Sequence, residues 1–115
     1  MAKSRIPSAL DRRHLIEREL SEANALAIAD AYLAEGRSIE ALDFLAKANA
    51  RDRLAELRAQ ALEAGDAFLL RAVARAMHEP PVRAEWGRVA AAAEAVGKQR
   101  YASEARRQAE RSGGD

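Results

Sequence analysis

The chain has 115 residues, and its 19 basic and 18 acidic side chains nearly cancel. That balance argues against a partner bound through charge alone, such as bulk duplex DNA or an anionic membrane surface. The absence of cysteine excludes disulfides, thiolate catalysis and cysteine-based zinc sites. No signal-peptide pattern opens the chain, and no run approaches the ~20 apolar residues of a membrane span, so we expect a cytoplasmic protein.

The residue types favour helix throughout. About a quarter of the chain is alanine, and about half of the remainder is Leu, Glu, Arg and Gln, which are all good helix formers. The period-two alternation of strands is missing, and there is no threonine, so we predict an all-α protein. Because alanine has little volume, the core is expected to be thin and the helices closely spaced.

Helix boundaries follow from caps, glycines and prolines. Ser8 is placed to cap a first helix, with Asp11 in its first turn. Pro80-Pro81 ends a later helix, and Pro81 is suited to the first turn of the next. Residues 8–111 are predicted to form one helical domain, with residues 1–7 as a flexible N-terminus and 112–115 as a disordered tail. Within it we expect a capping helix at 8–20 and hairpins at about 22–49, 51–78 and 81–111.

Glycines at 36, 65 and 97 are separated by 29 and 32 residues. A glycine just past the end of an apolar helical pattern is typical of a helix C-terminus. A recurring interval near 30 residues is typical of a repeat of helical hairpins. The order helix, glycine turn, helix is therefore predicted three times.

The first segment resembles a tetratricopeptide repeat in the order and spacing of Ile28, Ala29, Tyr32, Gly36, Ala41 and Ala48. The third segment matches at Trp86, Val89, Ala90, Gly97, Ala102 and Ala109, with Ala93 in place of the tyrosine. The second matches at Leu57 and Gly65, but Arg58 and Leu70 occupy positions where the family has small residues. The resemblance spans about residues 22–111 and implies antiparallel hairpins stacked as a short right-handed array.

An ordinary bundle is the alternative architecture. Residues 8–35 contain no glycine or proline, and neither do residues 38–64. Each segment is therefore compatible with one long helix, which gives a four- or five-helix bundle. Whether residues 49–52 break the helix decides between the two arrangements.

No motif predicts catalysis. His14 and His78 lack the spacing of a metal-binding motif. Ser8, Asp11 and His14 contain the residue types of a catalytic triad, but on one helix their spacing does not orient a base toward a nucleophile. We therefore expect a protein that is not an enzyme and has no catalytic, cofactor or metal site. The only Trp, Trp86, is predicted to lie in the core.

The predicted function is that of an adaptor or scaffold that binds a peptide or an amphipathic helix of another protein. The resemblance implies that the first helix of each hairpin lines a groove. The groove candidates are Leu26, Asp30, Leu33, Ala55, Ala59, Leu62, Ala84, Ala91 and Glu94. A structural homo-oligomer, such as a homodimer, is one alternative. A helical nucleic-acid-binding domain that uses Lys98, Arg100, Arg106, Arg107 and Arg111, with Tyr101 as a stacking surface, is the other.

Overall fold

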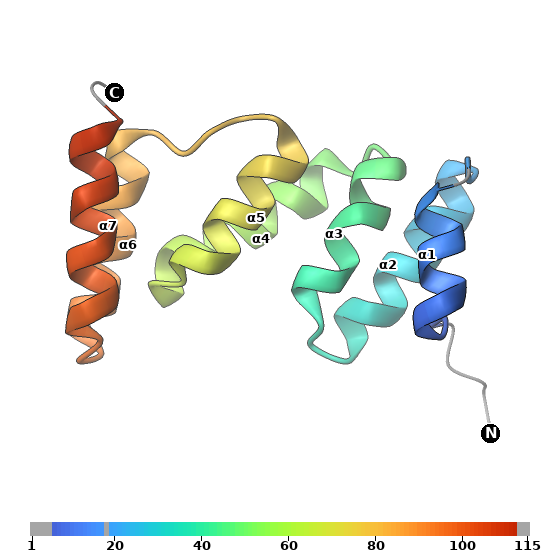
Figure 1. Cartoon of the computed structure of the whole chain (residues 1–115), viewed down its shortest axis with the longest axis horizontal. Helices are drawn as coiled ribbons and strands as arrows, with labels where there is room; N and C mark the ends of the chain where they lie inside the picture. The colour runs from blue at the N-terminus through green and yellow to red at the C-terminus, as the bar shows by residue number, and fades with distance from the viewer. Residues whose placement is uncertain (1–5, 18, 113–115) are drawn as a thin grey trace. The chain divides into compact units, whose positions relative to one another are not determined.

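The computed structural model describes residues 6–17 and 19–112, which form seven α-helices and no strand (Figure 1). The all-α prediction is therefore confirmed. The predicted flexible residues 1–5 and tail residues 113–115 lie outside the described residues. The helices are α1 (Ala9–Glu17), α2 (Glu22–Ala34), α3 (Ser38–Lys47), α4 (Arg51–Ala64), α5 (Ala67–Met77), α6 (Arg83–Ala95) and α7 (Gln99–Arg111). Of the described helices, none combines the length and the apolar character needed to cross a membrane.

The chain divides into two compact units. The first comprises Met1–Leu54 and contains α1, the α2–α3 hairpin and the first turn of α4. The second comprises Ala55–Asp115 and contains the rest of α4 with α5, and the α6–α7 hairpin. Each unit has its own buried apolar residues.

Helices α2 to α6 all end at a residue in the left-handed region. Gly36, Gly65 and Gly97 have φ of 72°, 69° and 80°, and Asn49 and His78 have φ of 53° and 57°. In each case the next residue donates its N–H to a carbonyl five residues back, which satisfies an otherwise free helix-end acceptor. These bonds are Arg37 to Tyr32 (2.9 Å), Ala50 to Leu45 (3.0 Å), Asp66 to Ala61 (2.9 Å), Glu79 to Ala74 (3.0 Å) and Lys98 to Ala93 (2.8 Å).

The observed helix ends contradict the two long helices, over residues 8–35 and 38–64, on which the bundle alternative depends. The turn at Asn49 separates α3 from α4, so residues 38–64 are not one helix. Residues 8–35 are interrupted as well, because α1 ends at Glu17 and Ser21 caps α2 by accepting the N–H of Asn24 at 3.1 Å. The cap requires extended backbone at Ser21, so the first helix is shorter than the predicted 8–20. Gly87, by contrast, lies inside α6 without interrupting it.

Helix α6 starts later than predicted. Val82 is its N-cap and has extended backbone, so Pro81 precedes the helix and is not in its first turn. Glu85 reaches back to accept the Val82 N–H at 3.0 Å. Together with the hydrogen bond from the Glu85 N–H to the Val82 carbonyl at 3.0 Å, this contact fixes the start of the helix at Arg83.

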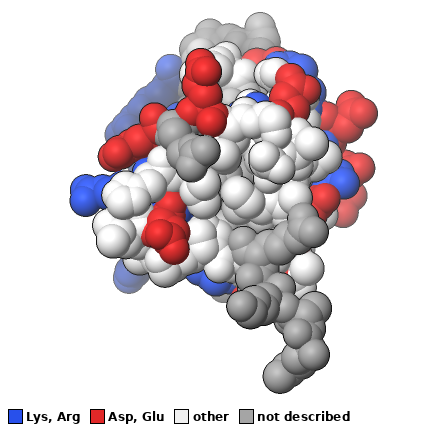
Figure 2. All heavy atoms as spheres, turned by 90° about the vertical axis from the view of Figure 1, so that its right-hand side faces the viewer, with Lys and Arg blue, Asp and Glu red and all other residues white. Residues whose placement is uncertain are grey.

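The core of the first unit is an aromatic pair. Tyr32 and Phe44 are fully buried, and their rings stack with centroids 5.9 Å apart. Arg12 of α1 lies over both rings, 5.6 Å and 5.5 Å from their centroids, and donates to the Glu40 carbonyl at 2.8 Å. Helix α1 thus covers the hairpin through a cation–π contact. On the face of this unit that carries α1, acidic side chains are dispersed around uncharged surface (Figure 2).

The α6–α7 hairpin of the second unit is packed largely with small side chains. Trp86 is 4% exposed, as predicted for a core residue, and Val89 is fully buried beside it in α6. Most of the remaining buried residues of α6 and α7 are alanines, which allow two helices to approach closely. They are Ala90, Ala93, Ala102 and Ala105.

The same positions relative to each turn glycine are buried in all three hairpins. Residues four before, five after and eight after the glycine are fully buried in every case. These residues are Tyr32, Ala61 and Ala93, then Ala41, Leu70 and Ala102, and then Phe44, Val73 and Ala105. The local unit of helix, left-handed turn and helix therefore recurs with a common buried register.

Candidate functional site

The predicted groove residues of the first unit lie on a half-buried face of α2. Leu26 lines a hollow of about 350 Å³ together with residues 49–53. Asp30 forms an ion pair with Arg53 in the first turn of α4, and Leu33 is half-buried. The turn at Asn49 thus places polar groups around the exposed part of Leu26.

The predicted groove residues of the second unit are mostly small or already engaged. Glu94 is ion-paired with Arg106 of α7. Leu62 is 7% exposed and belongs to the core, so the structure removes it from the predicted groove: a side chain packed inside the unit cannot contact a partner. The remaining candidates, all exposed, are Ala55, Ala59, Ala84 and Ala91.

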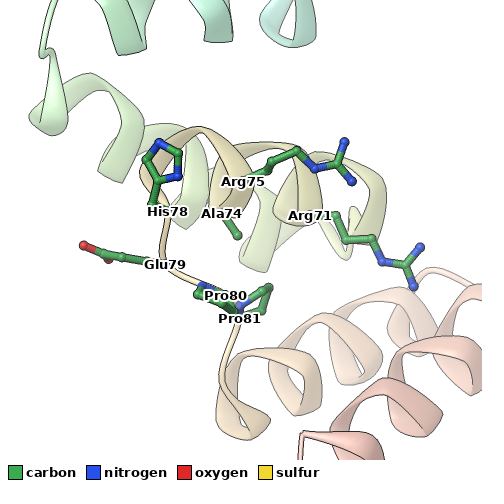
Figure 3. A pocket seen from close by; sticks show the side chains of 7 residues that line it. All are labelled: Arg71, Ala74, Arg75, His78, Glu79, Pro80 and Pro81. Atoms are coloured by element: carbon green, nitrogen blue, oxygen red, sulfur yellow. The ribbon is translucent and has the colours of Figure 1, made fainter.

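A hollow of about 420 Å³ lies beside α5, on a face that the sequence did not single out. Its lining includes Ala74 of α5 and the Pro80-Pro81 segment that follows the helix. Figure 3 shows Ala74 and the prolines facing one another, while the guanidinium of Arg75 points away from them. The floor is therefore apolar, and the charged groups lie at the rim.

A second hollow, of about 490 Å³, lies where α5 and α7 begin. Its walls carry the two most exposed aromatic side chains among the described residues, Phe68 at 70% and Tyr101 at 60% exposure. The other lining residues are Gly65, Asp66, Ala67, Arg71, Lys98 and Glu104. The two exposed rings therefore line the same hollow.

Arg71 lines both hollows and joins them along α5. Its guanidinium lies over the ring of Trp86, 5.4 Å from the centroid, and 3.5 Å from the carboxylate of Glu104. Phe68, Arg71, Ala74 and Arg75 follow helical spacing on one face of α5. We call the two hollows together the α5 surface.

Two of the three carboxylates that line the α5 surface, Asp66 and Glu104, have hydrogen-bond partners within the second unit, and the third is Glu79. Glu104 accepts from Gln108 at 3.0 Å and from Arg107 at 2.8 Å, and these bonds lower the pKa of Glu104 below its ordinary value. Asp66 caps α5 by accepting the Leu69 N–H at 3.0 Å. Lys98 and Arg75, in contrast, form no ion pair with any residue that the structure describes. The lining of the α5 surface thus carries three cations, Arg71, Arg75 and Lys98, and three carboxylates, Asp66, Glu79 and Glu104, beside the exposed aromatic rings.

The sequence did contain one signal for this surface. Phe68, Leu69 and Leu70 form an apolar run at the start of α5, and three consecutive residues cannot all face one side of a helix. Leu69 and Leu70 are buried, which leaves Phe68 in solvent. Which residue is exposed, and that Tyr101 lies beside it, required the structure.

The side chains considered for catalysis have structural roles or lie in solvent. Ser8 accepts the Asp11 N–H at 3.2 Å, as expected of the N-cap of α1. His14 is exposed on α1, and His78 is the left-handed residue that ends α5. Within residues 6–17 and 19–112, no three His, Asp or Glu side chains are grouped to hold a metal ion.

No protein-family model, curated protein or solved structure matches this chain. A function has to be argued from the residues of the chain and from the surfaces that they form.

Proposed function

We propose that this chain is a non-enzymatic interaction module, built as a tetratricopeptide-like array of helical hairpins, that binds a peptide or helix of another protein. The observation that carries the proposal is the recurrence of one local unit three times. Each of the three hairpins has the same left-handed glycine turn and the same three buried positions. A stack of such units buries apolar faces that one hairpin leaves exposed.

Contacts between the α4–α5 and α6–α7 hairpins support stacking within the second unit. The first helices are joined by Arg58 of α4, whose Nε and Nη2 each donate to Glu85 of α6 at 2.6 Å. The second helices are joined by Arg71 of α5 and Glu104 of α7. First helix against first helix, and second against second, is the pairing expected when each hairpin repeats the previous one.

The exposed apolar side chains support binding to a protein. Among the described residues, six large hydrophobic side chains are well exposed, and four of them, Leu10, Phe68, Val96 and Tyr101, exceed half of their full exposure. Removing these side chains from water on binding to a partner lowers the free energy of the complex. Aromatic side chains are also enriched among the residues that dominate binding energy at interfaces.

A selection from a display library of random short peptides on the full chain tests the proposal. We expect enriched peptides that, once synthesised, bind saturably and one to one, with dissociation constants of about micromolar order in fluorescence anisotropy. Binding should be lost when the chain is unfolded in urea. Failure to enrich any peptide above the level of an empty support would refute the proposal.

Two further measurements identify the alternatives. Sedimentation of the chain over a range of concentrations reports a homodimer. Titration with a single-stranded oligonucleotide at several salt concentrations reports nucleic-acid binding, which weakens steeply as salt rises. A tight homodimer or salt-dependent oligonucleotide binding, without peptide binding, would replace the adaptor proposal.

A further inference from the structure

We infer that helix α1 is a lid that opens from the α2–α3 hairpin while the hairpin stays folded, and that Arg12 is the side chain that holds the lid closed. Opening uncovers the side of the Tyr32–Phe44 pair over which the Arg12 guanidinium lies. The residues involved all lie within the first unit.

Helix α1 lacks a fully buried side chain. None of its nine residues is buried, and Leu10 is 62% exposed. Leu15 and Ile16 are only partly covered. A helix of this length is not stable alone in water, so it depends on packing against its neighbours. Helix α1 therefore lacks the apolar anchor that Tyr32 gives α2 and Phe44 gives α3.

Arg12 attaches α1 to the hairpin. Its guanidinium donates to the Glu40 carbonyl at 2.8 Å and lies 3.4 Å from the Asp43 carboxylate. It also lies over the rings of Tyr32 and Phe44. The Asp43 side chain is 58% exposed, so water weakens the ion pair. Because these contacts belong to one side chain, they are lost together when that side chain moves away.

The closed position of α1 leaves a polar group without a partner. The Nε of Arg12 is buried and has no hydrogen-bond partner among the residues that the structure describes. A buried donor without an acceptor is less stable than the same donor in water. Opening of α1 returns this donor to water, which lowers the free energy needed to open the lid.

The α2–α3 hairpin keeps its interior when α1 leaves. The stack of Tyr32 and Phe44 joins α2 to α3 without a residue of α1. Arg37 lies 4.9 Å from the centroid of the Tyr32 ring and is ion-paired with Glu40, so the ring retains a cation beside it. Opening thus removes the contacts of Arg12 and leaves the contacts within the hairpin in place.

Native-state hydrogen exchange of the full chain, followed by NMR at low urea concentrations, tests the lid. The amides of residues 12–17 should have protection factors at least about tenfold below those of the most protected amides of α2 and α3. Their exchange should depend little on urea, because opening α1 exposes little surface. Equal protection and equal urea dependence in the three helices would show that α1 unfolds only with the hairpin, which would overturn the inference.

Two substitutions at adjacent residues test the role of Arg12. Arg12→Ala removes the hydrogen bond and the cation–π contacts together, so it should lower the protection of the α1 amides by about tenfold. Arg13→Ala is the matched control, because Arg13 is exposed in the same helix, and it should change protection by less than about twofold. Equal effects of the two substitutions would show that α1 exchanges by fraying of its ends, and Arg12 would not hold a lid.

A third substitution keeps the lid open. His14→Pro interrupts α1 at an exposed residue. The amides of α2 and α3 should remain protected in this variant, and the hairpin should still unfold cooperatively, at a lower urea concentration because docked α1 no longer adds to its stability. Loss of protection throughout α2 and α3 would show that the hairpin needs α1 in order to fold, and the lid would be an integral part of the core.

Discussion

The first and second hairpins place different side chains at equivalent positions around the same turn. Tyr32 and Phe44, four residues before and eight after Gly36, stack inside the α2–α3 hairpin. The equivalent residues around Gly65 are Ala61 and Val73. All four are fully buried, so at these two positions the second hairpin has the smaller side chains, whereas five residues after the glycine it has Leu70 in place of Ala41.

The second hairpin also makes close contacts with the third. Arg58 stands where the other hairpins have Ala29 and Ala90, and it reaches Glu85 of α6. A Cβ on Gly65 would lie 2.5 Å from the backbone nitrogen of Ala93, whereas a Cβ on Gly36 would meet nothing within 4 Å. The first hairpin is thus packed around its aromatic pair and covered by α1, whereas the second is joined to the third. The same turn geometry is compatible with both kinds of packing because it fixes only where the helices end.

The largest loss of stability is expected from removing a buried ring from the interior of the first hairpin. Phe44→Ala removes one ring of the buried stack and leaves a cavity, so it should lower the free energy of unfolding by about 3–5 kcal/mol. Phe68→Ala makes the same change at a residue that is 70% exposed, and it should change stability by less than about 0.5 kcal/mol. Urea denaturation followed by circular dichroism measures both. Equal effects of the two substitutions would show that the first hairpin is not held by its aromatic pair.

Gly36 and Gly65 provide a sharper test of the difference between the first and second hairpins. Gly36→Ala incurs only the cost of a left-handed alanine, about 1 kcal/mol. Gly65→Ala has the same backbone cost and also pushes Cβ into the backbone of Ala93, so its total should be about 2–4 kcal/mol. Because a backbone atom of α6 cannot rotate away as a side chain can, the contact between the hairpins must open. The relation between the second and third hairpins would need revision if both variants had the same urea midpoint.

The sequence predicted the parts of the fold that depend on local chemistry. Gly36, Gly65 and Gly97 signalled helix ends because glycine adopts positive φ without strain. The ends at Asn49 and His78 use the same turn, but residues with a Cβ adopt it less readily. The sequence therefore left the break at Asn49 open and assigned the end of α5 to the prolines.

The candidate site was less predictable because it depends on contacts distant in sequence. Arg58 was recognised as unusual for a small-residue position, but its partner Glu85 is 27 residues away. The α5 surface likewise combines Phe68 with Tyr101 of another helix. The groove prediction relied on helix position alone, and it included Leu62 because periodicity does not decide which of two packed faces is open.

Breaking the Arg58–Glu85 pair should have an intermediate effect on the free energy of unfolding. Its side chains are 12% and 19% exposed, and Arg58 also donates to the Glu79 carbonyl at 3.0 Å. Arg58→Ala leaves a partly buried carboxylate without its partner, so it should lower the free energy of unfolding by about 1–3 kcal/mol. Arg106→Ala breaks the more exposed pair with Glu94 and should cost less than about 1 kcal/mol. A double-mutant cycle with Glu85→Gln isolates the coupling, and zero coupling would mean that this pair does not join the hairpins.

The smallest effect is the pH dependence of the same contact. Hydrogen bonds from Arg58, opposed by partial desolvation and aided by the Val82 N–H, lower the pKa of Glu85 below its ordinary value. A carboxyl group whose folded-state pKa is lowered stabilises the fold above its unfolded pKa of about 4.3, and this stabilisation is lost as pH falls through the folded pKa. The stability difference between the wild-type chain and Glu85→Gln should therefore be constant near neutral pH and shrink in acid below about pH 5.

Glu40 is the matched control in the first hairpin. Its pKa is also lowered, chiefly by its hydrogen bond with Arg37. The Glu40 side chain is 39% exposed, about twice the exposure of Glu85, so water and salt weaken its contribution. Urea unfolding at a series of pH values should show that the Glu40→Gln profile follows the wild-type chain more closely than the Glu85→Gln profile does. If Glu40→Gln removed as much of the pH dependence, the surface pair within the first hairpin would matter as much as the contact between the second and third hairpins, and the proposed contrast between the first two hairpins would fail.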